Sequence, residues 1–93
     1  MAFSISTRKI ISQADATRLD TLAQEVSQLQ DRVDGGYGGS LAADANDVRN
    51  ALRRYRRAIL RISGGNYRSH NYTESGRHVV PNHVECYFGE YVS

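Results

Sequence analysis

The sequence lacks the features that would place it in several protein classes. Cys86 is the single cysteine among 93 residues, so no disulfide can form within the chain. No run approaches the roughly 18 uninterrupted apolar residues of a membrane helix. No basic segment followed by an apolar one, as in a secretory signal, opens the chain. We therefore expect one soluble domain spanning residues 1–93, in the cytoplasm and without membrane contact.

Catalytic and cofactor motifs are also missing. The chain has no nucleophile elbow, no evident pair of carboxylates and no cofactor fingerprint. Cys86 alternates with the apolar Val84 and Phe88, whereas a thiolate nucleophile requires an exposed, electropositive setting. The sequence predicts a binding protein and not an enzyme, with no cofactor and no small-molecule substrate.

A metal site is the other chemistry that the residues allow. His78, His83 and Cys86 could supply three ligands, the last two with a two-residue gap between them, and the fourth would have to be His70 or a carboxylate on a different strand. Structural zinc prefers four ligands in two close pairs, and only one such pair is present. On a strand with a period of two, Cys86 fills the core with its apolar neighbours. We expect no metal site.

Acidic residues are absent from residues 49–61, which hold six of the eleven arginines. Residues 49–77 contain eight arginines and one glutamate, a net charge of +7, although the whole chain carries only +2. A solvated helix face usually mixes both signs, with acids four residues ahead of bases. Guanidinium groups suit two-point contacts with phosphate or carboxylate. This segment therefore predicts an electronegative partner.

Two segments have the apolar spacing of helices, separated by the glycine-rich residues 35–39. Ser12 and Ser40 are predicted N-caps, and Gly35 and Gly64 begin the glycine pairs that end the helices. A short glycine-rich link predicts that the chain turns back as an antiparallel hairpin over about residues 13–63. The apolar stripes predicted to pack together are Leu19, Leu22, Val26, Leu29 and Val33, and Leu41, Ala45, Val48, Leu52, Tyr55, Ile59 and Ile62.

The remaining chain, about residues 66–92, is predicted to be rich in β-structure. Three short β-prone runs, Tyr67–Tyr72, Arg77–Val80 and Val84–Phe88, are separated by turn residues. Phe3 and Ile5 alternate with serines and predict a further strand beside the carboxyl-terminal one. The expected fold is of the α+β class, an antiparallel helical hairpin packed on a small antiparallel β-sheet.

Two other interpretations of the basic and glycine-rich segments fit the pattern less well than a binding surface. The glycine loop could cradle a phosphate, but it follows a helix and no Lys-Ser or Lys-Thr comes after it. A helix-turn-helix needs short helices and a tight turn, which this pattern does not offer. Acids of the first helix can also neutralise part of the basic face: Asp20, Glu25 and Asp31.

Arginine and tyrosine are both enriched at recognition surfaces, and both can stack on unpaired bases. Five of the six tyrosines lie outside the helical stripes. The residues predicted to contact a partner are Arg49, Arg53, Arg54, Arg56, Arg57, Arg61, Arg68, Tyr37 and Tyr67.

Three stretches give the chain a family resemblance: the opening 1–15, Thr-Leu-Ala-Gln-Glu-Val-Ser-Gln-Leu-Gln in the first helix, and Asn-Ala-Leu-Arg-Arg-Tyr-Arg-Arg-Ala-Ile-Leu in the second. Together they resemble a small phage anti-CRISPR protein of the type I-F inhibitors. The resemblance implies a non-catalytic protein in the cytoplasm of the infected bacterium. It would bind Cas subunits of the type I-F guide-RNA surveillance complex and block its binding of target DNA.

The charge of the chain constrains this interpretation. A DNA mimic should be strongly acidic, whereas this chain is slightly basic. The arginines would instead engage acidic protein patches or the phosphates of the guide RNA. The alternative is a basic phage nucleic-acid-binding regulator or a small structural protein.

Overall fold

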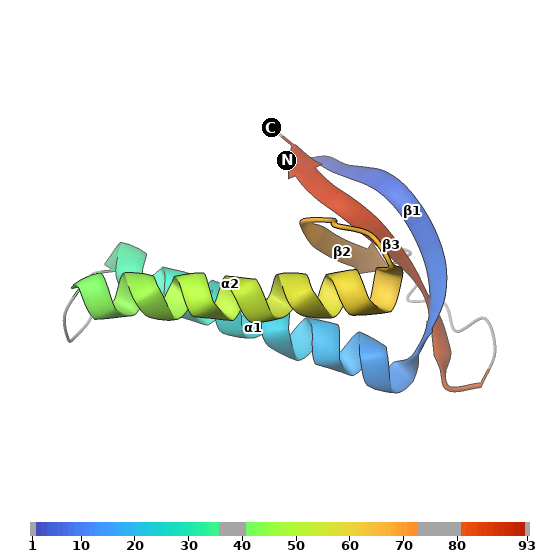
Figure 1. The fold of residues 1–93 in the computed structure, drawn as a ribbon, viewed down its shortest axis with the longest axis horizontal. Coiled ribbons are helices and arrows are strands. Elements are labelled where there is room, and N and C mark those ends of the chain that lie inside the picture. Colours follow the sequence, from blue (N-terminus) through green and yellow to red (C-terminus); the bar gives the residue numbers. More distant parts are fainter. Residues whose placement is uncertain (1, 36–40, 73–80, 93) are drawn as a thin grey trace.

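The computed structural model describes residues 2–35, 41–72 and 81–92, and places them in two helices and a three-stranded sheet (Figure 1). This arrangement confirms the predicted α+β class. Tyr37, Ser40 and the predicted strand 77–80 lie outside the described residues, as does the glycine loop from residue 36 onward. The elements in chain order are β1 (Ala2–Ser12), α1 (Gln13–Gly35), α2 (Leu41–Ser63), β2 (Ser69–Tyr72) and β3 (His83–Val92).

The two helices form the predicted antiparallel hairpin (Figure 1). Ser12 caps α1, because its hydroxyl accepts a hydrogen bond from the backbone N–H of Asp15 at 3.1 Å. At the far end of α2, the N–H of Gly64 donates to the carbonyl of Leu60 at 2.9 Å, and Gly64 has a φ of 78°. Glycine adopts this left-handed conformation without steric cost, so it ends the helix. Neither described helix combines the length and the apolarity that crossing a bilayer requires.

The sheet has the order β1-β3-β2, with both pairs antiparallel. The predicted pairing of the amino-terminal and carboxyl-terminal strands is therefore confirmed. Ile11 lies opposite Val84 and Thr7 opposite Phe88, and a bulge between Ile5 and Thr7 shifts the register. β2 covers only residues 69–72 of the predicted run 67–72, because residues 64–68 connect α2 to the sheet.

The core lies where one end of the hairpin meets the sheet. Val84, Cys86 and Phe88 face the helices from β3, as their alternation predicted. In Figure 1 the other end of the hairpin extends beyond the sheet. At that end, the apolar stripes of α1 and α2 are therefore covered only by each other. The buried residues of the cluster are Ile11, Ala16, Leu19, Leu22, Tyr55, Ala58, Ile59, Ile62, Val84, Cys86 and Phe88.

The predicted apolar stripes of α1 and α2 need one correction. Leu22 and Ile59 are buried, but Leu29 and Leu52 are only partly buried. Leu29 lies toward the end of the hairpin beyond the sheet, whereas Leu52 lies on the side of α2 that lines a surface hollow. In their place α2 buries Ala51 and Ala58, which are 1% and 3% exposed. Their small side chains allow the two helices to approach closely.

Candidate interaction surface

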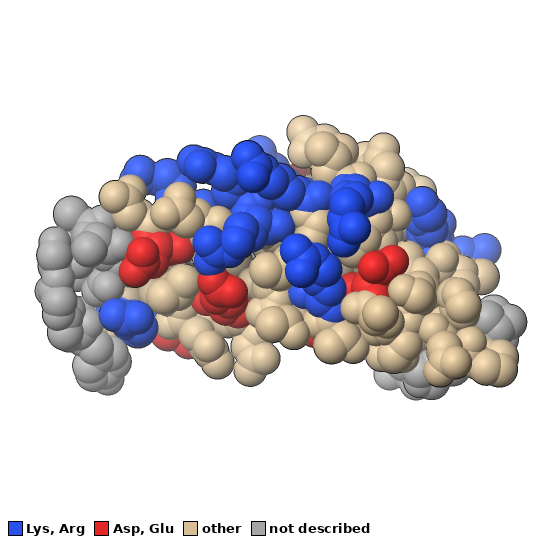
Figure 2. Space-filling model, turned by 60° about the horizontal axis from the view of Figure 1, so that its bottom comes forward, with Lys and Arg blue, Asp and Glu red and all other residues tan. Residues whose placement is uncertain are grey.

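The arginines of α2 lie mainly on the side of the helix away from the core. Side chains of five of them are exposed, since the 3.6-residue period places them away from the apolar stripe: Arg49, Arg53, Arg54, Arg57 and Arg61. Figure 2 shows Lys and Arg atoms in a band along the length of this face, with acidic atoms gathered below it. One helix therefore displays five of the twelve basic side chains of the protein on one surface.

Only part of this charge is neutralised. Arg54 forms an ion pair with Glu25 of α1, as predicted for that acid. Asp20 instead contacts His70, and no carboxylate among the described residues pairs with Arg53, Arg57 or Arg61. Exposed ion pairs contribute only about 0–1 kcal/mol to stability. The ion pair of Arg54 therefore offsets little of the repulsion among the arginines of α2.

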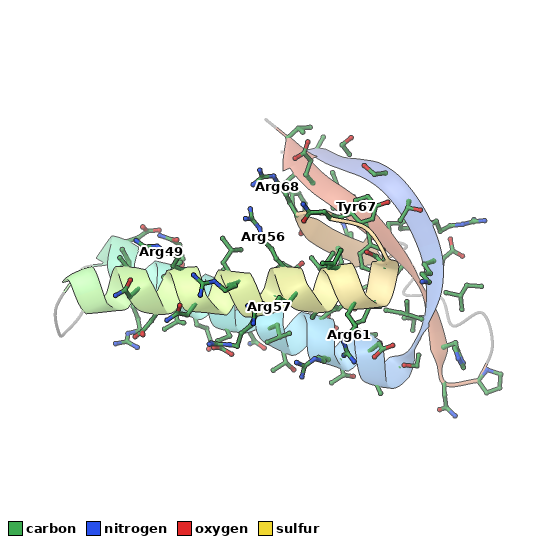
Figure 3. All side chains as sticks on the ribbon, in the orientation of Figure 1. Arg49, Arg56, Arg57, Arg61, Tyr67 and Arg68 are labelled. Atoms are coloured by element: carbon green, nitrogen blue, oxygen red, sulfur yellow. The ribbon has the colours of Figure 1, made fainter. Side chains whose placement is uncertain are left out.

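Arg56 differs from the other arginines of the band. It is partly buried, and Figure 3 shows it rising from α2 toward the segment that carries Tyr67 and Arg68, while Arg61 lies on the side next to α1. Its Nε is buried and has no hydrogen-bond acceptor within the described part of the chain. A buried donor left unpaired costs about 1–3 kcal/mol. The free protein therefore holds a donor that an added acceptor would satisfy.

Two hollows on this surface share the residue Asn66. The larger of the two, of about 330 Å³, is lined by Arg49, Leu52, Arg53, Arg56, Arg57, Leu60 and Asn66. The second, of about 290 Å³, is lined by Ser6, Asn66, Tyr67, Arg68, Gly89 and Glu90. Asn66 belongs to both, so the two hollows adjoin at the connection between α2 and the sheet. We call the two hollows together the basic groove.

The predicted contact residues outside α2 also border this groove. Arg68 is exposed and lies 3.8 Å from a carboxylate oxygen of Glu90. Tyr67 is half-buried, because its ring stacks on Phe88 with centroids 6.0 Å apart and packs close to Gly65. It offers the second hollow only part of its surface, while Tyr37 lies outside the described residues.

A second polar cluster joins the hairpin to the sheet. The hydroxyl of Tyr55 donates to Nδ1 of His70 at 2.6 Å, and Nε2 of His70 donates to Asp20 at 2.9 Å. Tyr72 lies 2.9 Å from the same carboxylate oxygen. This order of acid, imidazole and hydroxyl is that of a nucleophilic triad. However, Tyr55 is 6% exposed and burial raises its pKa, so its hydroxyl is neither accessible nor activated.

Two of the residues considered for metal binding, His70 and Cys86, are held within the protein by other interactions. Both ring nitrogens of His70 are occupied by Tyr55 and Asp20. Cys86 is completely buried, and burial raises the pKa of its thiol to about 12, so it is protonated at neutral pH. No group of three potential metal ligands occurs among the described residues, and His78 lies outside them.

The sequence pattern locates the arginines but not the groove. Leu52, predicted to lie in the core, lines the larger hollow, and Leu60 and Asn66 carry no sequence signal that singled them out. The 3.6-residue period could have placed Leu60 beside Arg53 and Arg57 on the outer side of α2. Comparisons with protein-family models, curated proteins and solved structures found no match to this chain.

Proposed function

We propose that this protein is a phage anti-CRISPR protein that binds the type I-F guide-RNA surveillance complex and blocks its access to target DNA. The observation that carries the proposal is the arginine band of α2, whose outer charges Arg53, Arg57 and Arg61 have no carboxylate partner within the described residues. The sequence resemblance supplies the identity of the target. The proposed partners are Cas subunits and the guide RNA.

The mode of action that fits this surface is steric. The protein measures 45 × 28 × 23 Å, and its hairpin projects beyond the sheet as a rod (Figure 1). The basic band would attach to an electronegative part of the complex, and the body of the protein would then occupy space that target DNA needs. Charge complementarity of this kind favours rapid encounter and a fixed orientation.

A charge-reversal experiment tests this proposal. The double variant Arg53→Glu/Arg57→Glu changes the formal charge from +2 to −2, because each replacement removes a positive charge and adds a negative one. Both side chains are exposed, so the fold should persist in a circular dichroism melt. We expect the concentration that inhibits DNA binding by the purified complex to rise by at least about 100-fold, as loss of several charge contacts implies.

The matched control is Lys9→Glu/Arg18→Glu, which makes the same change in total charge outside α2. Both residues are exposed, on β1 and α1. This control should inhibit like the parent protein. Equal inhibition by both folded double variants would remove the arginine band from the interface.

The alternative function is a basic phage nucleic-acid-binding regulator. The outer arginines of α2 favour it, since a row of exposed guanidinium groups can follow a phosphate backbone. Pull-down of the tagged protein from cells with an assembled surveillance complex, compared with its binding to naked duplex DNA, separates the two. Capture of duplex DNA without capture of the complex would favour the regulator.

A further inference from the structure

One arginine of the basic groove, Arg56, differs from the exposed arginines of α2 in its surroundings. Arg56 is partly buried at the junction between α2 and the connection to the sheet, and its Nε has no acceptor among the described residues. It lines the larger hollow together with Asn66, whose side-chain amide supplies both a donor and an acceptor. Two neighbours in the same lining, Arg53 and Arg57, add positive charge.

This combination is chemically specific. The Nε–H and a terminal N–H of a guanidinium form a planar fork that binds two oxygens of one anion. An anion seated here would also reduce the repulsion among Arg53, Arg56 and Arg57, which have no carboxylate partner among the described residues. The site is therefore built for an oxyanion that enters the hollow.

The lining also indicates what surrounds the anion. Leu60 is 49% exposed, and with the partly buried Leu52 it gives the larger hollow apolar surface between the arginines. Along α2, Arg49, Arg53 and Arg57 follow one another at about 6 Å, since four helical residues rise 1.5 Å each. Anions that repeat along a chain, with apolar groups between them, match this pattern. A nucleic-acid strand has that composition.

The setting of Arg56 favours a single strand over a duplex. Proteins read duplexes with exposed helices or ribbons that enter the grooves, whereas Arg56 is partly buried in a hollow lined by α2 and by Asn66 of the connection to the sheet. Beyond Asn66 the strand would meet Arg68 and part of Tyr67. Glu90 lines that second hollow and pairs with Arg68, so we place the phosphate beside Arg56 and not beside Arg68.

We propose that the basic groove binds the phosphodiester backbone of a single-stranded nucleic acid, with Arg56 and Asn66 holding one phosphate. This inference rests on the proposed function, because it names the chemical part of the nucleoprotein complex that the arginine band contacts. The exposed arginines supply general attraction, and Arg56 supplies the two-point contact.

The test measures fluorescence anisotropy of labelled single-stranded RNA and DNA, each of about ten nucleotides, with the protein alone over a range of salt concentrations. Arg56→Lys keeps the charge but removes the fork, so its affinity should fall about tenfold, while the salt dependence stays near that of the parent. Arg56→Gln should weaken binding further and reduce the slope of log K against log salt by about 0.7. The RNA and DNA arms show which strand is the source of the phosphate.

Arg61 provides the matched control. It is an exposed arginine of α2 that lines neither hollow and has no carboxylate partner among the described residues. Arg61→Lys should change affinity by less than about twofold, because a lysine supplies the same general attraction. Equal losses for Arg56→Lys and Arg61→Lys, or none for either, would overturn the inference. Displacement of the strand by a polyglutamate peptide of equal charge at equal concentration would assign the groove to an acidic protein segment instead.

A second measurement needs no variant. The Nε–H resonance of Arg56, followed by NMR with ¹⁵N-labelled protein, should shift when the oligonucleotide is added and should shift in the same direction with inorganic phosphate. An unmoved Nε resonance at saturating oligonucleotide would also overturn the proposal. Inhibition of the surveillance complex is scored separately, so loss of strand binding with intact inhibition rejects this site alone. Strand binding without inhibition rejects the proposed function alone.

Discussion

Nδ1 of His70 lies 2.6 Å from the hydroxyl of Tyr55, and this contact fastens β2 to the middle of α2. The same hydroxyl accepts a hydrogen bond from the backbone N–H of His70 at 3.1 Å. One oxygen atom therefore satisfies two buried groups of a residue that is itself 8% exposed. Without it, the strand β2 would keep unpaired polar groups against the helix.

Replacement of Tyr55 by phenylalanine should lower the free energy of unfolding by about 1–3 kcal/mol, because it leaves the imidazole nitrogen and the N–H of His70 unsatisfied. Urea unfolding followed by circular dichroism measures this change. Tyr91→Phe is the control, since Tyr91 is 49% exposed and its variant should stay within about 0.5 kcal/mol of the parent. Equal stability of the two variants would show that the Tyr55 contact adds nothing to the fold.

The position of the core predicts a gradient of stability along the hairpin. Ile59 is fully buried against the sheet, so Ile59→Ala should cost about 2–5 kcal/mol. Leu29 is only partly buried in the part of the hairpin beyond the sheet, and Leu29→Ala should cost less than half as much because the site stays open to water. Urea midpoints compare the two. An equal loss at both sites would contradict a core concentrated at one end.

We expect that position 89 does not tolerate even the methyl side chain of alanine. A Cβ at this position would overlap the backbone carbonyl of Ser4 in β1, the strand that pairs with β3 and whose bulge shifts the register next to Ile5. Backbone cannot move aside as a flexible side chain can, so Gly89→Ala should cost at least about 1–3 kcal/mol, as overpacking does.

Gly64→Asn is the comparison for this variant. A Cβ at Gly64 would have nothing within 4 Å, but the residue has a positive φ, a conformation that asparagine tolerates better than most other residues. The variant should lose at most about 1 kcal/mol in a thermal or urea melt. A Gly89→Ala variant as stable as Gly64→Asn would contradict the close approach of the two strands.

Burial of Cys86 predicts a loss of stability at alkaline pH. Its folded pKa is raised to about 12 from an ordinary value of 9.0, chiefly by burial and then by the charge of Asp20. Well below the ordinary pKa, the Cys86 thiol is protonated in both the folded and the unfolded protein, so its ionisation does not affect stability. Between the ordinary pKa and the raised one, the unfolded thiol ionises while the folded one does not. The unfolded state then binds fewer protons, and stability falls as pH rises.

Urea unfolding at about pH 8 and about pH 10.5 measures this effect. The difference between the two pH values should shrink in Cys86→Ala but persist in part, because burial also raises the pKa of Tyr55 and Tyr72. An unchanged difference in the variant would show that the thiol does not titrate in this way.

The local features of the chain were readable from its sequence. The bounds of α1 and α2 follow from the 3.6-residue period, the serine cap at Ser12 and the glycine at Gly64, because each acts within a few residues of itself. The exposure of Arg53 and Arg57 follows from the same period. The charge that carries the proposed function was therefore visible without coordinates.

Tertiary structure decided how those elements meet. His70 and Asp20 are 50 residues apart in sequence, and no local pattern pairs them. The turn of α2 that faces the sheet leaves Arg56 partly buried, with its Nε unpaired among the described residues, while Arg53 remains in water. Periodicity fixes the angular spacing of side chains around a helix but not which side a neighbouring sheet will cover. That choice depends on contacts between distant segments, so only the folded chain shows the basic groove.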